Sequence, residues 1–379
     1  MAFQLTEEQL VVQELVRQFA EKIVAPRAKE VDEKGRFPAD TVKRMAEQGL
    51  LTINVPEEYG GAGLDEMCKL LAIIELAKKC ASTAEIFAVQ GLVNEIILRH
   101  GTEEQKQKYL RLAGEGKLGA FALTEPGAGS DAGGLKTKAV KDGEQYVLNG
   151  TKCFISNMGK DEGDFAIIVA LTDPSAGTRG MTTFIVDRDT PGFSVGKVEE
   201  KMGMRGAAVS ELVLDNVRIP ESQRLGKEGE GFKIAMAGLD GGRVGIAAQS
   251  IGLAKGCLEE AVNYAKQRVQ FGKPIAALQT IQNYVAEMAA RIEAAYSLMV
   301  LTSNKRMAGE PSSKECAMTK YIASETCKFA ADTALQIHGG YGYMKDYAIE
   351  RMYRDARILT IYEGTSEVQR VVIARALLR

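Results

Sequence analysis

The sequence of 379 residues has no tryptophan, two histidines and six cysteines, and these scarcities narrow what it can do. No two cysteines stand in a C-x-x-C pattern, which argues against both a disulfide framework and a thiolate metal site. A zinc site or a Ser-His-Asp triad would need His100 or His338, and neither has a matching motif nearby. We therefore expect free buried thiols, no metal and a cytoplasmic protein.

Long apolar runs and clustered charge are missing as well. No run approaches the roughly 18 apolar residues that cross a bilayer. The start, MAFQLTEEQL, has neither the basic end nor the apolar centre of a signal peptide. The formal net charge is −2, with basic residues spread along the chain, whereas nucleic acid requires a basic face. Neither a membrane nor a nucleic acid is an expected partner.

The first of three regions, residues 1–118, has a helical period throughout. Thr6 and Gln9 form a capping box ahead of the first helix. The apolar positions that we expect this helix to bury are Leu10, Val11, Leu15, Phe19 and Val24.

The character changes near residue 118 and again near residue 230. Residues 119–229 contain short runs rich in Val, Ile, Phe and Thr between turn residues, which indicates antiparallel β structure rather than a doubly wound parallel sheet. Residues 230–379 return to long amphipathic helices with short loops, which is typical of an antiparallel bundle. The predicted fold class is α+β, mostly α, with an N-terminal helical domain, a middle antiparallel β domain and a C-terminal helical bundle.

The loop LTEPGAGSDAGG, residues 123–134, is the most unusual one. Its spacing Gly127-x-Gly129-x-x-Ala132 nearly matches a dinucleotide fingerprint, which requires a helix to begin in the loop. The next segment alternates like a β-hairpin instead, so the fingerprint is rejected. Two interpretations remain: a plain glycine-rich turn, or a loop whose Ser130 and neighbours approach a ligand closely.

Three charged residues stand in settings that allow more than one interpretation. Glu363 lies between the mostly apolar run ILTIY and Gly364, so it is either a helix-end acid favoured by the helix dipole or a group held for chemistry. Arg243 and Arg268 are either solvated helix residues or ligand contacts. The segment HGGYGY, residues 338–343, is a turn whose paired glycines also permit close approach by another molecule.

Ten motifs occur in the order and spacing of one family: VPEEYGGAG, LTEPGAGSD, NGTKCFISN, KMGMRG, GFKIAM, LDGGRVGIAAQ, QRVQFGKP, LQIHGGYGY, MYRDARI and IYEGTSEVQR. Through them the chain resembles the acyl-CoA dehydrogenase family nearly from end to end, and in particular its bacterial short-chain, butyryl-CoA dehydrogenase-like members. The resemblance implies FAD held between the domains and a homotetramer in which a neighbouring subunit completes each flavin site. It also implies α,β-dehydrogenation of an acyl-CoA thioester to a trans-2-enoyl-CoA, with electrons passed to an electron-transfer flavoprotein.

The resemblance assigns roles residue by residue. Glu363 aligns with the family's general base, and Ser130, Asp240, Arg243 and Gly364 align with substrate contacts. Expected contacts to the flavin are Leu123, Thr124, Ser130, Phe154, Ile155, Ser156, Thr365 and Glu367. Expected contacts to the FAD of a partner subunit are Arg268, Gln279, Gln336, Ile337, His338, Gly339 and Gly340.

Burial explains why a carboxylate can act as the base in this setting. The apolar neighbours Ile361 and Tyr362 are expected to raise the pKa of Glu363 towards neutrality, and Gly364 lets the backbone come close to the thioester. Some family members carry the base at the position of Gly242, where a glycine cannot serve. Phe154 stands where many relatives have tryptophan, which leaves the path of electron exit open.

Other functions remain compatible with the sequence. An enoyl-CoA reductase would run the same chemistry in reverse, with an electron-transfer flavoprotein as donor. An acyl-CoA oxidase is disfavoured because those chains usually carry an extra C-terminal domain. A flavin-free helical scaffold would lack the yellow colour of a flavoprotein. The acyl group itself is not indicated by any single residue.

Overall fold

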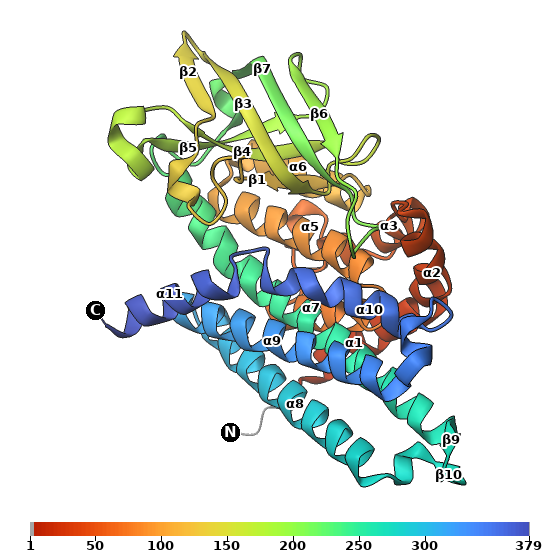
Figure 1. Cartoon of the computed structure of the whole chain (residues 1–379). Helices are drawn as coiled ribbons and strands as arrows, with labels where there is room; N and C mark the ends of the chain where they lie inside the picture. Colours follow the sequence, from red (N-terminus) through yellow and green to blue (C-terminus); the bar gives the residue numbers. More distant parts are fainter. Residues whose placement is uncertain (1–3, 379) are drawn as a thin grey trace.

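The computed structural model describes residues 4–378, with a β-sheet at one end, a helical layer beneath it and a long helical bundle at the other end (Figure 1). The N-terminal helices are α1 (Glu7–Phe19), α2 (Ala25–Lys34), α3 (Ala39–Glu47), α4 (Glu66–Ala77), α5 (Ala81–His100) and α6 (Glu103–Gly114). The predicted capping box is confirmed, because Thr6 Oγ1 accepts from Gln9 N at 3.2 Å while Gln9 Oε1 accepts from Thr6 N at 3.0 Å.

The buried face of α1 differs from the predicted one. Phe19 and Val24 are buried as expected, but Leu10, Val11 and Leu15 are 51%, 59% and 60% exposed. The buried face consists of Gln9, Val12, Val16 and Phe19. Polar contacts to α4 and to the residue before it select this face: Gln9 donates to Asp65 at 2.7 Å and Gln13 donates to Glu75 at 3.0 Å. This helix has two apolar stripes, and the hydrogen bonds to residues 65 and 75 determine which of the two is buried.

Helix α5 is the centre of the N-terminal region. By length and composition it is apolar enough to cross a membrane, with a mean hydropathy of 1.2, which the sequence analysis did not anticipate. However, 83% of its apolar window is buried inside the fold, where it packs against α4, α6, α7 and β1. Its apolar character therefore supplies the core, and the helix separates the sheet from the bundle (Figure 1).

The middle region is a twisted sheet with the strand order β6-β7-β3-β2-β4-β5-β8, and β1 pairs with β4. The strands are β1 (Gly119–Ala122), β2 (Lys138–Asp142), β3 (Gln145–Ser156), β4 (Phe165–Leu171), β5 (Met181–Asp187), β6 (Phe193–Val198), β7 (Val209–Pro220) and β8 (Arg224–Leu225). Most pairs are antiparallel as predicted, but β1 and β2 each run parallel to β4, so the sheet is mixed. The β2–β3 hairpin intervenes between β1 and β4, which lets the chain return beside β1 in the same direction.

The C-terminal region is the predicted helical bundle. It consists of α7 (Gly231–Gln267), a short hairpin of β9 (Val269–Gln270) and β10 (Lys273–Pro274), then α8 (Gln279–Met307), α9 (Ser313–His338), α10 (Ala348–Ala356) and α11 (Ser366–Leu377). The most extensive helix pair is α7 with α9, and α7 also packs on α4 and α5. One apolar core therefore joins the N-terminal helices to the bundle, while the sheet keeps a core of its own.

Candidate active site

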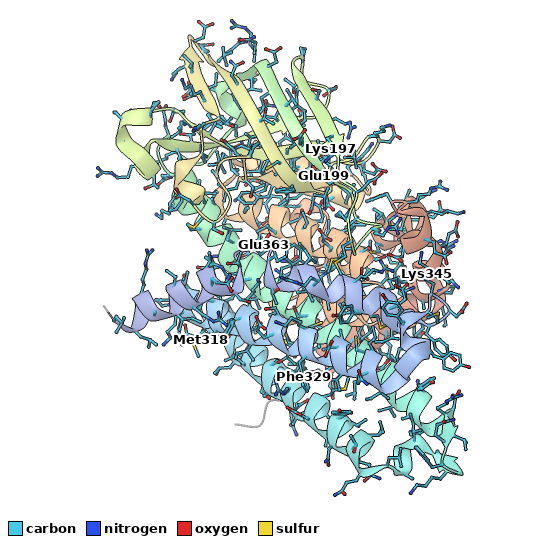
Figure 2. All side chains as sticks on the ribbon, in the orientation of Figure 1. Lys197, Glu199, Met318, Phe329, Lys345 and Glu363 are labelled. Carbon is cyan, nitrogen blue, oxygen red and sulfur yellow. The ribbon has the colours of Figure 1, made fainter. Side chains whose placement is uncertain are left out.

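Glu363 lies on the segment between α10 and α11, next to α7 and on the side of the bundle that faces the sheet (Figure 2). Its backbone is left-handed, with φ 54°, and Gly364 follows with φ 88°. A non-glycine residue in that region is held there by its surroundings at a cost of about 1–3 kcal/mol. The Oε2 atom is buried and has no hydrogen-bond partner within residues 4–378. Burial raises the pKa of Glu363 to about 7, against the opposing charges of Arg243 and Lys320.

Two side chains hold the backbone of this segment. The carbonyl of Gly364 accepts hydrogen bonds from Lys320 Nζ at 2.8 Å and from Gln369 Nε2 at 2.9 Å, and Gln369 also donates to the carbonyl of Glu363 at 3.1 Å. Burial lowers the pKa of Lys320 to about 8. The backbone N–H of Glu363 donates to no acceptor in the described part of the chain, which leaves a donor beside the carboxylate. The sequence analysis did not single out Lys320 or Gln369, because no local pattern connects them to Glu363.

Helix α7 forms the wall opposite Glu363. A Cβ added to Gly242 would lie 2.8 Å from Glu363 Oε2, so the glycine gives the carboxylate its room. Arg243 pairs with Asp240 at 2.6 Å, and Asp240 also accepts a hydrogen bond from Ser313. The Nε atom of Arg243 is buried without a partner among the described residues. The two α7 residues predicted to contact substrate are therefore joined to each other, with one donor left unused.

The glycine-rich loop is pinned by a buried ion pair. Glu125 accepts from Lys152 Nζ at 2.8 Å and from the backbone amides of Lys136 and Thr137 at 2.6 and 3.0 Å. Lys152 also donates to the carbonyl of Leu123 at 3.1 Å. Loop position is thus fixed from behind, while Ser130 at its outer end is exposed. The ion pair and these hydrogen bonds give the loop a defined position.

The end of β3 lies beside that loop. The pairing with β7 shifts register between Lys152 and Ile155, and at this bulge Phe154 has φ 58° and is 66% exposed. The neighbouring Cys153 amide donates to the carbonyl of Thr124 at 2.9 Å, whereas Ile155 is buried. Phe154 therefore presents an aromatic face to the outside next to the loop.

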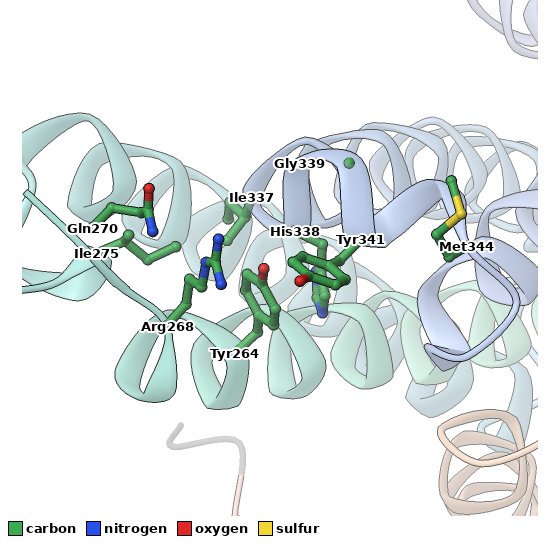
Figure 3. A pocket seen from close by; sticks show the side chains of 10 residues that line it. Tyr264, Arg268, Gln270, Ile275, Ile337, His338, Gly339, Tyr341 and Met344 are labelled. Carbon is green, nitrogen blue, oxygen red and sulfur yellow. The ribbon is translucent and has the colours of Figure 1, made fainter.

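A cavity of about 500 Å³ lies at the other end of the bundle (Figure 3). Its walls include the predicted residues Arg268, Ile337, His338, Gly339 and Gly340. Residues that the sequence analysis did not predict there are Tyr264, Gln270, Ile275, Tyr341 and Met344. By contrast, the predicted residues Gln279 and Gln336 are exposed and do not line it.

Aromatic stacking shapes that cavity. The imidazole of His338 stacks on the ring of Tyr264 with centroids 4.3 Å apart, and its Nδ1 lies 2.8 Å from the carbonyl of Ala334. The guanidinium of Arg268 lies 5.2 Å from the ring centroid of Tyr341. The arrangement combines flat rings with an arginine, which suits a ligand that carries an aromatic base and a phosphate.

A smaller cavity of about 160 Å³ collects the remaining predicted cofactor residues, Thr365 and Glu367. Its walls also contain Arg357 and an ion pair between Lys328 and Glu325, whose Nζ and Oε2 atoms are 3.0 Å apart. Thr365 caps α11 by accepting a hydrogen bond from the amide of Val368 at 3.3 Å.

The residues present fit a flavin dinucleotide. An exposed phenylalanine beside a fixed loop can cover a flat ring, and the glycines 127 and 129 have no atom within 4 Å of an added Cβ, so the loop surface is open. In the larger cavity Arg268 can hold a phosphate, and the rings of Tyr264 and Tyr341 can lie against an adenine. Among the described residues no group of three or more metal-binding side chains occurs.

Comparison with protein-family models identifies all three regions. The model described as acyl-CoA dehydrogenase, N-terminal domain, matches residues 6–117, the middle-domain model matches 120–217, and the C-terminal-domain model matches 229–378. An acryloyl-CoA reductase (NADH) of Anaerotignum propionicum is 52% identical over 100% of this chain and 96% of its own length. A short-chain specific acyl-CoA dehydrogenase of Clostridium acetobutylicum is 46% identical over 100% of both chains.

Solved structures with the same fold belong to similar proteins. Butyryl-CoA dehydrogenase from Megasphaera elsdenii has a TM-score of 0.97 and 44% identity, covering 100% of both chains. A chain in the structure described as an electron transferring flavoprotein of Acidaminococcus fermentans has a TM-score of 0.98 and 45% identity, again over 100% of both chains. An acyl-CoA dehydrogenase complexed with FAD from Bacillus anthracis has a TM-score of 0.92 and 36% identity, covering 99% of this chain and 69% of that one.

Proposed function

The chain belongs to the acyl-CoA dehydrogenase family, and on that premise we propose that Glu363 is the base with which this FAD-dependent oxidoreductase interconverts an acyl-CoA thioester and its trans-2-enoyl-CoA. One observation carries the assignment. The Glu363 carboxylate has a buried oxygen without a partner, and the pKa of Glu363 is raised to about 7 by burial. A base with a pKa near the working pH exchanges protons most effectively.

The chain's own residues account for the proton chemistry. Glu363 removes the α-proton from the thioester and returns it in the reverse direction. As the proton leaves, negative charge develops on the thioester carbonyl oxygen, and the free backbone N–H of Glu363 is a donor for it. Such a donor is typically worth about 3–4 kcal/mol in the transition state. Lys320 and Gln369 keep that backbone in place from behind.

The cofactor is FAD, which supplies the acceptor for the hydrogen and electron pair that leave the β-carbon, and the donor when the reaction runs backwards. We assign the flavin side of the site to Leu123, Thr124, Ser130 and the segment 154–156. Their support is the exposed Phe154 at the bulge of β3 and the loop that Lys152 fixes beside it.

The rest of the predicted cofactor contacts favour a shared site. Arg243 and Arg268 stand on or at the end of the same helix, 25 residues apart, which corresponds to about 38 Å. The cavity around Arg268 therefore lies far from Glu363 of its own chain. We propose that it completes the FAD site of a neighbouring subunit in a cytoplasmic homotetramer, and we retain 1–118, 119–229 and 230–379 as the domain division.

The relatives support one class of electron partner and both directions of the reaction. One is named as a reductase that uses NADH and another as a dehydrogenase, and the same base serves both directions. The match to a chain from an electron transferring flavoprotein structure supports that class of partner. We propose an electron-transfer flavoprotein as partner, without direct use of NADH by this chain, because its near-fingerprint loop enters a hairpin and not a helix.

The test is anaerobic reduction of the purified yellow protein by a panel of short, branched, cyclic and aryl-substituted acyl-CoAs. At least one should bleach the flavin absorbance near 450 nm, and Glu363→Gln should bind the same thioester without bleaching. Colourless protein, or bleaching of the variant at the parental rate, contradicts the proposal. Addition of NADH alone, and then of an electron-transfer flavoprotein, separates the two electron donors.

A further inference from the structure

A second carboxylate, Glu85, is buried close to the catalytic one and has no role in the proton chemistry. It lies on α5, inside the apolar stretch that packs between the sheet and the bundle, and is 3% exposed. Its Oε1 accepts a hydrogen bond from Ser156 Oγ at 2.8 Å, and Ser156 is the last residue of β3. No hydrogen bond or ion pair reaches its Oε2 from any residue between 4 and 378, and unlike Glu363 Oε2 this oxygen is not fully enclosed. A ligand that covers this oxygen without donating a hydrogen bond to it would leave an unpaired buried charge, which costs several kcal/mol.

Hydrogen bonds place Glu85 next to the catalytic segment. Tyr362, the neighbour of Glu363, donates its hydroxyl to Gln249 at 2.5 Å. Gln249 in turn donates to the carbonyl of Ala81 at 2.9 Å, and Ala81 is one helical turn before Glu85 on the same face of α5. Glu85 therefore lies between the end of β3 and the segment of Glu363, on the flavin-facing side of the site.

The charged neighbours of Glu85 do not neutralise it. Lys201 is near enough to lower the pKa of Glu85, but its Nζ donates to the carbonyl of Ala207 at 2.7 Å. The Asp355 and Glu363 carboxylates raise that pKa, and Asp355 accepts from the amide of Met204. With burial as the largest cause, the pKa of Glu85 rises to about 7. The Oε2 atom of this carboxylate still lacks a hydrogen-bond donor, whereas Oε1 accepts from Ser156.

We propose that Glu85 selects acyl groups that carry a hydrogen-bond donor, namely a hydroxyl, phenol or amine, and that its Oε2 accepts from that donor. This rests on the proposed function, since it takes the acyl chain to extend from the thioester at Glu363 past Ser156 towards α5. A hydrocarbon acyl group would shield Oε2 from water and leave that oxygen without a partner. A donor-bearing acyl group satisfies it instead.

The experiment measures kcat/KM for pairs of acyl-CoA thioesters. The two members of a pair differ only at the end of the acyl group, which carries a methyl in one and a hydroxyl or an amine in the other. Each pair is measured with the parent, Glu85→Gln and Glu85→Leu. Hydrogen bonds to charged groups predict that the parent prefers the hydroxyl or amine member by about 10–100-fold in kcat/KM. Glu85→Leu should reverse the preference. Glu85→Gln should keep part of the hydroxyl preference and lose the amine preference. The amine pair thereby tests the contribution of the Glu85 charge, and the hydroxyl pair tests the contribution of a hydrogen bond to Glu85.

Binding gives a second readout that does not depend on turnover. Dissociation constants of the matched saturated thioesters, measured with Glu363→Gln as background, should show the same ratio and the same dependence on Glu85. If Glu85 only positions Ser156, both members of each pair will change equally and the flavin content will fall, which overturns the proposal. An unchanged ratio in Glu85→Leu overturns it as well. Absence of bleaching by every thioester in the parent would instead reject the proposed function itself.

Discussion

Gly242 and Glu363 meet face to face: a Cβ at position 242 would stand 2.8 Å from the Oε2 of Glu363. A side chain that starts at Gly242 therefore points at the place that the Glu363 carboxylate occupies. The two positions are 121 residues apart in sequence, on α7 and on the segment before α11, yet side chains from both would reach the same place in the site.

This juxtaposition predicts that the base can be moved. Glu363→Gly should lose about 10²–10⁴ in the rate of flavin bleaching, as expected for loss of a general base. Adding Gly242→Glu should restore at least part of that loss, because the new carboxylate enters the vacated volume. Rapid-mixing measurements of bleaching check this. A double variant no faster than Glu363→Gly, with normal flavin content, would show that the direction of approach matters more than proximity.

The raised pKa of Glu363 predicts opposite pH dependences for the two directions. Dehydrogenation requires the ionised carboxylate, so its rate should increase with pH through a midpoint at about pH 7 and level off above it. Reduction of the enoyl thioester requires the protonated form, so its rate should fall above the same pH. Single-turnover rates in both directions across the pH range measure this. A midpoint near the ordinary pKa of glutamate would mean that the carboxylate is solvated in the complex.

Lys320 should act on the base through position and charge. Lys320→Met removes the donor to the Gly364 carbonyl and a cation that lowers the pKa of Glu363. The dehydrogenation profile should therefore move to higher pH, with a lower plateau. Lys43→Met, which removes an exposed lysine on α3, is the control and should leave the profile in place. A lower plateau at an unmoved midpoint would leave Lys320 with a purely structural role.

Arg268 should couple flavin retention to assembly. Arg268→Ala is expected to weaken FAD binding by about 10–100-fold, the range for a charge-assisted hydrogen bond, while helical content stays constant. Flavin-to-protein ratios after dilution, together with sedimentation, report both quantities. Arg218→Ala, at an exposed arginine of β7 paired with Asp142, is the matched control. A monomer that keeps its FAD would reject the shared site.

Sequence patterns predicted the order of helical, β and helical regions because hydrophobic period and turn residues are local properties. They did not predict which face of α1 is buried, since Leu10 and Val16 belong to two stripes of similar apolar character. Hydrogen bonds from Gln9 and Gln13 towards α4 make that choice, and they join residues 56 and 62 positions apart. The parallel partnership of β1 and β4 depends in the same way on tertiary contacts.

The candidate site shows the same division. Glu363 stands out in the sequence because an acid follows an apolar run, and Glu85 also has apolar neighbours, Ala84 and Ile86. Lys320 and Gln369 carry no such signal, because their importance lies in contacts to one carbonyl group. Local sequence indicates unusual residues, whereas their partners become visible only once the chain is folded.

Helix α7 fixes the distance and the relative orientation between two sites. Gly242 and Arg243 on this helix lie beside Glu363, and the helix ends at Arg268 beside the cavity that Tyr264 and His338 also line. No proline interrupts the helix between the two sites. Each residue of a helix advances by about 1.5 Å and turns by about 100°. Inserting one residue into this interval would therefore swing Arg268 away from its cavity, while four would almost restore its direction but displace it by about 6 Å. A shared FAD site therefore predicts that insertions or deletions between Gly242 and Arg268 impair FAD binding more than substitutions in the same interval do.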